Sequence, residues 1–221
     1  MVCSSTDDGL QMNECGLEKP HFSFERLFVV RHGETDWNAA NRLQGRTDIA
    51  LNETGRYQAK QNGQRMADYL SHLNEDLGNW HFVASPLKRT RETMEILREA
   101  LGLERDGYDV SEQLIELCYG AWEGRSWQDL REEVPELIKD RFAHPWDMVA
   151  PGGGESHDEM RARVVSWMQG LPQKTIAVTH TGPLRIVRGA IDTSMSDDEI
   201  AVQVCPQDQF LDMRPDRFGW V

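Results

Sequence analysis

Five charged or imidazole side chains follow apolar runs of strand length, and together they suit chemistry on a phosphoryl group. They are Arg31, His32, Lys88, Arg89 and His180. A guanidinium fork binds phosphoryl oxygens through two parallel hydrogen bonds. An imidazole can attack phosphorus with one nitrogen while a backbone carbonyl holds the N–H of the other. Because the carboxyl ends of the strands in a doubly wound sheet border one crevice, we expect these side chains to converge.

The stretch SPLKRTR places three cations, Lys88, Arg89 and Arg91, in the first two turns of an expected helix. Cations there oppose the helix macrodipole, and each costs about 0.3–1 kcal/mol. A bound anion would remove the conflict, because guanidinium groups and free backbone N–H groups would then both point at it. The alternative is a solvated helix face on which the cations pair with Glu92 or Glu95. This stretch alone leaves both interpretations open.

Glycines close to the two histidines strengthen the prediction of a shared site. Gly33 follows His32, and Gly182 lies two residues after His180. Glycine lets the backbone approach a ligand closely or adopt a positive φ. A lone histidine at a strand end is more often structural than catalytic. The prediction therefore depends on the conjunction of histidines, arginines and glycines at strand ends.

Strands alternate with helices along the chain, which predicts a mostly parallel sheet covered on both faces. The expected strands are residues 26–32, 80–85 and 174–180, and the expected helices are residues 54–73, 85–101, 126–142, 156–171 and 181–191. Ser85 suits an N-cap with Pro86 at the first helical position, and Pro135 should break the third helix. Ser156 and Glu159 fit a capping box. The expected fold class is α/β, a three-layer sandwich with helices on both faces of the sheet.

The composition is that of an ordinary globular domain. The 221 residues include 24 Lys and Arg against 37 Asp and Glu, and the net charge of −13 argues against a nucleic-acid surface. No apolar run reaches the length of a membrane span and no signal peptide is visible, so we expect a cytoplasmic protein with no membrane partner. Residues 1–25 are expected to form a polar, poorly ordered extension, and residues 26–221 a single catalytic domain. The ending from Cys205 is expected to form a strand pair that covers a sheet edge or joins copies into a homo-oligomer.

Five motifs in order make the chain resemble the histidine phosphatase superfamily, in its phosphoglycerate-mutase-like branch with the RHG signature. VRHGETDWN resembles the signature itself, and NRLQGRTDIALNETGRYQA resembles the segment after it. SPLKRTRET resembles the second arginine motif, LIELCYGAWEG the motif with the proton donor, and PGGGES with VTHTG the closing elements. The resemblance runs from Leu27 to at least Ile191 and implies the fold expected above.

The resemblance also implies catalytic roles. His32 is implied as the nucleophile that becomes phosphohistidine. Arg31, Arg89 and His180 are implied to hold the phosphoryl oxygens and stabilise their charge during transfer. Glu116 is implied to protonate the leaving oxygen and later to accept a proton from water. From the residues alone, the apolar neighbours of Glu116 would bury it partly and suit an acid–base role, whereas without the motif a surface glutamate on an edge strand is the default.

Further residues are implied to surround the phosphoryl group. Asn38 would add a hydrogen bond to that group, and Gln44, Gly45 and Tyr119 would line the substrate side of the pocket. No metal ion and no other cofactor is implied, because arginines and histidines neutralise the phosphate. The family usually has glycine where this chain has Thr181, whose side chain is expected to narrow the pocket.

Three functions are compatible with these motifs. We expect a metal-independent phosphatase that acts on small phosphomonoesters through a phosphohistidine, with a small phosphorylated metabolite as its partner. The LQGRTD segment resembles the phosphatase members of the branch. The alternatives are phosphotransfer of the cofactor-dependent phosphoglycerate mutase type and an inert binding protein on the same fold.

Overall fold

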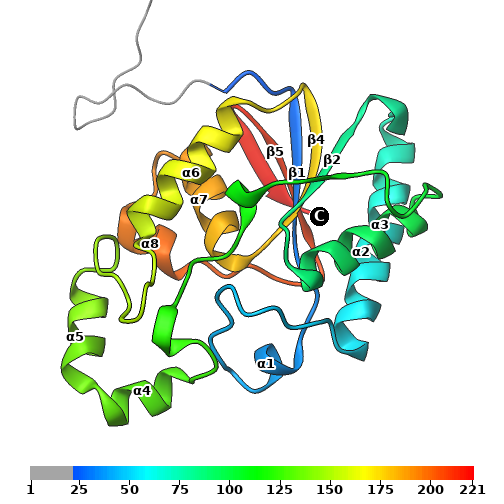
Figure 1. Cartoon of the computed structure of the whole chain (residues 1–221). Coiled ribbons are helices and arrows are strands. Elements are labelled where there is room, and N and C mark those ends of the chain that lie inside the picture. Colours follow the sequence, from blue (N-terminus) through cyan, green and yellow to red (C-terminus); the bar gives the residue numbers. More distant parts are fainter. Residues whose placement is uncertain (1–21) are drawn as a thin grey trace, which may run out of the picture.

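A mixed sheet forms the centre of the computed structural model, which describes residues 22–221 (Figure 1). The strand order is β3-β2-β4-β1-β5-β6. The strands are β1 Arg26–Arg31, β2 His81–Ala84, β3 Asp109–Val110, β4 Lys174–Thr179, β5 Phe210–Arg214 and β6 Arg217–Trp220. The strands β1 to β4 pair in parallel, whereas β5 and β6 are antiparallel to their neighbours. The prediction of a mostly parallel sheet is confirmed.

Helices cover both faces of this sheet, as predicted. In Figure 1, α2 and α3 lie on one side of the strands, and α6, α7 and α8 lie on the other. The helices are α1 Asp36–Ala39, α2 Glu53–His72, α3 Lys88–Ala100, α4 Trp127–Glu133, α5 Pro135–Ala143, α6 His157–Gln169, α7 Thr181–Ile191 and α8 Asp197–Val202. Short 3-10 turns span Leu77–Asn79, Glu112–Leu114 and Gly120–Trp122. The three layers match the expected α/β sandwich.

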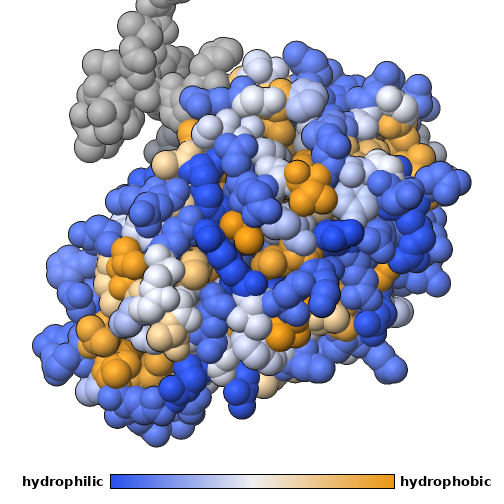
Figure 2. Space-filling model, in the orientation of Figure 1, coloured by the Kyte–Doolittle hydropathy of each residue, from blue (hydrophilic) through white to orange (hydrophobic). Residues whose placement is uncertain are grey.

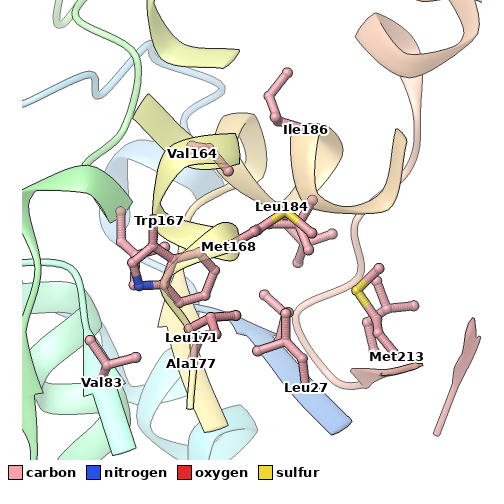
Figure 3. Packing of buried hydrophobic residues seen from close by; sticks show 14 of the residues in the cluster. Leu27, Val83, Val164, Trp167, Met168, Leu171, Ala177, Leu184, Ile186 and Met213 are labelled. Atoms are coloured by element: carbon pink, nitrogen blue, oxygen red, sulfur yellow. The ribbon is translucent and has the colours of Figure 1, made fainter. Parts of the chain in front are cut away.

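Alternate residues of β1 face the two helical layers. Leu27 and Val29 belong to a core cluster with residues of α6 and α7, including Met168 (Figure 3). Phe28 and Val30 belong to a second cluster with residues of α2 and α3. A strand buried on both faces needs an uninterrupted apolar run, which is why only apolar residues lie between Arg26 and Arg31, the two ends of β1.

The packed domain begins earlier than the expected boundary at residue 26. Phe22 and Phe24 are 8% and 1% exposed and belong to the same cluster as Leu27. Residues 22–25 therefore pack onto the domain, because two aromatic rings outweigh the polar residues around them. The rest of the expected extension, residues 1–21, lies outside the described residues.

The prediction that Ser85 caps a helix is wrong. α3 begins at Lys88 with Leu87 at the N-cap position and no side-chain cap. The N–H of Ser85 donates to the carbonyl of Val178, so Ser85 continues the pairing of β2 with β4 and cannot cap. Other local predictions are confirmed: the helical stretch is broken at Pro135, and the capping box at the start of α6 forms.

The ending forms the predicted strand pair. β5 pairs with β1, and β6 pairs with β5 as the outer strand of the sheet. α4 and α5 lie apart from the sheet, and apolar side chains gather on the surface over them (Figure 2), where Leu137 and Phe142 are exposed. A homo-oligomer stays a prediction.

Candidate active site

A cavity of about 570 Å³ opens where β1 ends and α7 begins. All but one of the predicted site residues line it: Arg31, His32, Asn38, Gln44, Gly45, Arg89, Glu116 and Tyr119. The exception is His180, which has no exposed surface and whose ring centre lies 5.1 Å from that of His32. The fold therefore brings together residues that are up to about 150 positions apart in the sequence, as the strand-end argument predicted.

The backbone fixes which nitrogen of His32 is free. Its Nδ1 lies 2.7 Å from the carbonyl oxygen of Gly33, and a carbonyl can only accept, so Nδ1 carries the proton. Burial, and next the charges of Arg89 and Arg31, hold the pKa of His32 well below 6.5. The ring is therefore neutral near pH 7, and its Nε2 keeps a lone pair.

His180 is held between a hydroxyl group and a guanidinium. Its Nε2 lies 2.7 Å from Oγ of Ser85, and its Nδ1 accepts a bond of 3.3 Å from Nε of Arg89. Burial, and next the charge of Arg89, keep the pKa of His180 well below 6.5. His180 is therefore neutral with its proton on Nε2, and Oγ of Ser85 accepts the hydrogen bond from this N–H group. Direct contact between His180 and a phosphoryl group stays a prediction.

Arg31 brings a guanidinium to the cavity with part of it unpaired. Its Nη1 donates to the carbonyl of Cys205 at 2.8 Å, whereas its buried Nε has no hydrogen-bond partner among residues 22–221. Burial lowers the pKa of Arg31. A buried N–H donor without a partner costs free energy, so an anion in the cavity would relieve this cost.

Arg89 is the cation of the α3 start that enters the site, and it is fully buried. It donates to the carbonyls of Thr47 and Gly45 at 2.8 and 2.7 Å. Burial lowers its pKa to about 10, so the group stays charged near pH 7. Together with the bond from Nε to His180, these bonds fix the plane of the guanidinium and leave one N–H on Nη1 and one on Nη2 for a ligand.

The other two cations of that helix start do not join the site. Lys88 pairs with Asp48, and its Nζ lies 3.6 Å from the carboxylate. Arg91 donates to the hydroxyl of Tyr108 at 3.4 Å. Each of the two interpretations of this stretch is therefore correct in part: Arg89 faces the cavity, while Lys88 and Arg91 make surface contacts, although not with Glu92 or Glu95.

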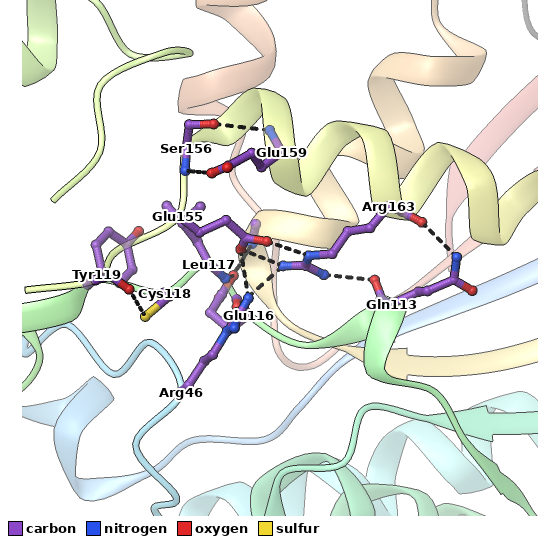
Figure 4. Close-up of polar contacts among 12 residues, drawn as sticks. Arg46, Gln113, Glu116, Leu117, Cys118, Tyr119, Glu155, Ser156, Glu159 and Arg163 are labelled. Carbon is purple, nitrogen blue, oxygen red and sulfur yellow. Dashed lines mark hydrogen bonds and ion pairs between the residues drawn. The ribbon is translucent and has the colours of Figure 1, made fainter.

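Glu116 lies in an irregular segment and not on an edge strand. Its Oε1 accepts hydrogen bonds from the backbone N–H groups of Gly182 and Leu117 at 3.1 and 3.0 Å. Arg46 and Arg163 approach its backbone carbonyl at 3.4 Å each, and Glu155 pairs with both arginines (Figure 4). The start of α7 and this ion-pair network therefore hold the carboxylate at the cavity.

Polar groups of the remaining predicted residues line the cavity. Oδ1 of Asn38 accepts from the N–H of Thr35 at 3.1 Å, which leaves the Nδ2 donors as the groups that suit a phosphoryl oxygen. Oε1 of Gln44 is buried and has no partner within the described part of the chain. Burial, and next Glu116, raise the pKa of Tyr119 to about 12, so its hydroxyl keeps its proton.

The glycines near the histidines serve protein packing. A Cβ on Gly33 would lie 2.2 Å from the carbonyl oxygen of Gly55 in α2. A Cβ on Gly182 would lie 2.4 Å from Oε1 of Glu116. Neither glycine has a positive φ. Both glycines therefore allow close approach of protein groups, the backbone of α2 and the carboxylate of Glu116, and a close approach to a ligand stays a prediction.

Gly45 does require the left-handed region, with φ +52°. Glu123 lies beneath this turn and accepts hydrogen bonds from the N–H groups of Arg46 and Thr47 at 2.9 and 3.0 Å. The turn directs the Gly45 carbonyl toward Arg89. Glu123 was missed in the sequence, because nothing in LCYGAWEG distinguishes a carboxylate that folds a distant loop.

Four other functional side chains were also missed. Ser85 binds His180, and Thr93 accepts from the N–H of Gly33 at 3.1 Å. Gln207 donates to the carbonyl of His32 at 3.0 Å, and Arg185 lines the cavity. Thr181 lines it as well, at the place where the sequence suggested a narrower pocket. Of these residues, only Arg185 could have been found in the sequence, because it is the one charged residue in the mostly apolar stretch TGPLRIV.

Residues 22–221 contain neither a candidate metal-binding cluster nor a candidate membrane-spanning helix. No three His, Cys, Asp or Glu side chains gather there in a way that would hold a metal ion. No helix in that range combines the length and apolar character that crossing a membrane requires.

Comparison with known proteins agrees with the geometry of the site. The profile of the histidine phosphatase superfamily (branch 1) matches residues 27–202. Phosphoglycerate mutase-like protein 4 of Arabidopsis thaliana is 34% identical over 184 residues, which cover 79% of this chain and 74% of that protein. A metal-independent phosphoserine phosphatase of the same organism is 31% identical over 168 residues, which cover 73% of this chain and 66% of that protein.

A solved structure shares the fold. The alpha-ribazole phosphatase from Shigella flexneri superimposes with a TM-score of 0.69 and 24% identity, covering 85% of this chain and 89% of that one. The profile match spans most of the chain and includes Arg31, His32, Arg89 and His180. The chain belongs to the histidine phosphatase superfamily, branch 1, and is a phosphatase- or mutase-type member of it.

Proposed function

We propose that this protein is a metal-independent phosphatase that hydrolyses small phosphomonoesters through a phosphohistidine at His32. The observation that carries the proposal is the hydrogen bond of Nδ1 to the Gly33 carbonyl, which leaves Nε2 of a neutral, buried imidazole at the cavity. A nucleophile needs a lone pair, and the low pKa of His32 preserves it near pH 7.

The surrounding charges suit a phosphoryl group in transfer. Nε2 of His32 forms a bond to phosphorus while the bond from phosphorus to the ester oxygen breaks. Arg31 and Arg89 bind the equatorial oxygens, whose negative charge persists through the transition state. His180 keeps Arg89 in place through its Nδ1. These fixed cations supply the electrostatic stabilisation that a metal ion would otherwise give.

Glu116 acts first as the general acid and then as the general base. In its protonated form it donates a proton to the leaving ester oxygen, so that an alcohol departs. Water then attacks the phosphohistidine, Glu116 accepts a proton from that water, and the bond from phosphorus to Nε2 breaks to release inorganic phosphate. The N–H groups of Gly182 and Leu117 keep one carboxylate oxygen fixed during both steps. The other oxygen is the one that exchanges the proton.

A mutase is the second candidate, favoured by the name of the phosphoglycerate mutase-like relative. In a mutase, the phosphohistidine would return its phosphoryl group to another hydroxyl of the same substrate rather than to water. The LQGRTD segment supports hydrolysis, because it resembles phosphatase members of the branch.

One assay separates these functions. Phosphate release is measured with EDTA present, using 4-nitrophenyl phosphate, phosphoserine and 3-phosphoglycerate. The last is also checked for 2-phosphoglycerate, with and without 2,3-bisphosphoglycerate. We expect phosphate release that His32→Ala abolishes and that His72→Ala, which removes an exposed imidazole at the end of α2, preserves. Formation of 2-phosphoglycerate without release of phosphate would make the protein a mutase. If neither product forms, the inert binding protein is the alternative that is left.

The role of Glu116 has its own test. Glu116→Gln should slow hydrolysis of alkyl phosphates by about 10²–10⁴-fold, since their leaving oxygen needs a proton. Hydrolysis of 4-nitrophenyl phosphate, whose leaving group is stable as an anion, should fall much less. Equal losses on both substrates would show that Glu116 is not the acid.

A further inference from the structure

Arg185 is a cavity-lining cation that phosphoryl transfer, as described above, does not use. It lies on α7, one turn beyond the N–H of Gly182 that holds Glu116. The cavity lining includes Arg31, Arg42, Arg89 and Arg185, but its only acids are Glu34 and Glu116. Within residues 22–221, Arg185 forms no ion pair with a carboxylate. Its charge is therefore available to a ligand.

The position of Arg185 is fixed relative to Arg31. Nε of Arg185 donates to the carbonyl of Gln203 at 2.9 Å, and Nη1 of Arg31 donates to the carbonyl of Cys205 at 2.8 Å. Residues 203–205 follow the end of α8, and their exposure alternates as in an extended chain. Carbonyls two residues apart in such a chain point the same way and lie roughly 7 Å from each other. The two guanidinium groups therefore donate to the same short stretch of backbone at the cavity wall.

Neither cation forms an ion pair with a carboxylate within residues 22–221, and the two repel one another. The charge of Arg185 contributes to the lowered pKa of Arg31. Burial raises the pKa of Tyr119, and the charge of Arg185 opposes this rise in part. Arg185 thus lies within reach of both the phosphoryl side of the cavity, at Arg31, and the leaving-group side, at Tyr119 and Glu116.

We propose that Arg185 is a specificity-determining residue that binds a carboxylate on the leaving group of the substrate, so that the enzyme prefers carboxylate-bearing phosphomonoesters. The inference rests on the proposed function. Its Nε is already used by Gln203, which leaves the Nη1 and Nη2 groups for the ligand. One guanidinium matches one carboxylate in charge and geometry, and the gap to Arg31 spans the few bonds between a phosphate and a carboxylate on one short carbon chain.

Matched substrate pairs test this proposal. 3-Phosphoglycerate is compared with glycerol 3-phosphate, and phosphoserine is compared with phosphoethanolamine. The first compound of each pair has a carboxylate, and the second lacks it. Arg185→Gln should lower kcat/KM for the carboxylate members by about 10- to 100-fold, the value of a lost charge-assisted hydrogen bond. The losses for glycerol 3-phosphate, phosphoethanolamine and 4-nitrophenyl phosphate should stay below about threefold. Arg185→Lys, which keeps the charge, should recover part of the preference.

Arg188→Gln is the matched control. Arg188 lies on the same helix, stacks over the ring of Phe218 and does not line the cavity. Removing its charge should leave the ratio between the paired substrates unchanged. Activity of Arg185→Gln on 4-nitrophenyl phosphate shows that the variant is folded. Equal losses of kcat/KM on all substrates in Arg185→Gln, or no loss on any, would overturn the proposal. It would also be overturned if Arg188→Gln changed the ratio between the paired substrates as much as Arg185→Gln does.

The failure of this proposal can be told from the failure of the proposed function. If the wild-type protein releases no phosphate from any ester, the phosphatase proposal fails. Calorimetric titration with 3-phosphoglycerate and glycerol 3-phosphate then still tests Arg185. Tighter binding of 3-phosphoglycerate that Arg185→Gln removes would support the carboxylate site, and equal binding of the two would overturn it.

Discussion

Replacing His157 with glutamine should flatten the acid side of the stability curve of this protein. His157 begins α6, is 9% exposed, and lies with its Nδ1 2.7 Å from Nη2 of Arg141. Burial, and next the charges of Arg141 and Arg185, lower the pKa of His157 from 6.5 to about 3. The folded protein therefore keeps this imidazole neutral at pH values where the unfolded chain protonates it.

The size of the effect follows from proton linkage. Below pH 6.5 the unfolded chain binds a proton at His157 that the folded protein does not bind. The free energy of unfolding then falls by about 1.4 kcal/mol for each pH unit until the pH approaches the folded pKa. This stabilisation is present in full above the unfolded pKa and is lost toward acid, by about 2.5 kcal/mol between pH 7 and pH 4.5. Glutamine does not titrate, and its amide oxygen can accept the bond from Arg141.

The assay is urea unfolding at half-unit intervals from pH 7 to pH 4.5. The difference in unfolding free energy between wild type and His157→Gln should change by about 2.5 kcal/mol over this range. The control is His144→Gln, the same exchange at a histidine that is 61% exposed and pairs with Asp140, so that general effects of replacing histidine by glutamine can be subtracted. Parallel curves for wild type and His157→Gln would refute the reasoning, because His157 would then bind protons equally in both states.

Three further predictions concern His32, the proposed nucleophile, and two residues near it, Ser85 and Gly33. In ¹⁵N NMR spectra, His32 should stay neutral with its proton on Nδ1 as the pH falls through 6.5, because burial and two arginines hold its pKa well below that value; a midpoint near 6.5 would contradict this. Ser85→Ala should lower the free energy of unfolding by about 1–3 kcal/mol, since it leaves the Nε2–H of His180 unpaired, and unchanged stability in urea would contradict that hydrogen bond. Gly33→Ala should destabilise by about 1–3 kcal/mol or more, because its Cβ would meet the backbone of α2 at 2.2 Å, and a variant with the thermal midpoint of the wild type would show that this contact relaxes.

Much of the fold could be predicted from local patterns in the sequence. β1 and β4 each contain a run of apolar residues, Leu27–Val30 and Ile176–Val178, because both faces of each strand are buried, and the capping box of α6 is a local interaction within four residues. The boundary before β1 was placed too late. The apolar contribution of Phe22 and Phe24 depends on residues that join them only in three dimensions.

The candidate site could be predicted where chemistry and strand ends coincide, and not where partners are distant. Arg31 and His32 follow directly from the end of β1. The role of Ser85 depends on His180, which is 95 positions away, and local pattern alone suggested a helix cap. Glu123 holds the turn at residues 45–47, and Arg185 lines the cavity. Neither a turn held from a distance nor a cavity wall produces a periodic pattern in the sequence. Long-range contacts of this kind leave no trace in spacing or propensity.

The strand order has a consequence for when activity can first appear during synthesis. β1 carries His32, the proposed nucleophile, at its end, yet it lies between β4 and β5, which are made much later. The carbonyl of Cys205 that holds Arg31, and the amide of Gln207 that holds the His32 backbone, also come late in the chain. A nascent chain on the ribosome therefore contains His32 long before it can fix that histidine in place. The proposed phosphatase activity is accordingly expected only after residues 205–214 have left the exit tunnel and β5 has paired with β1.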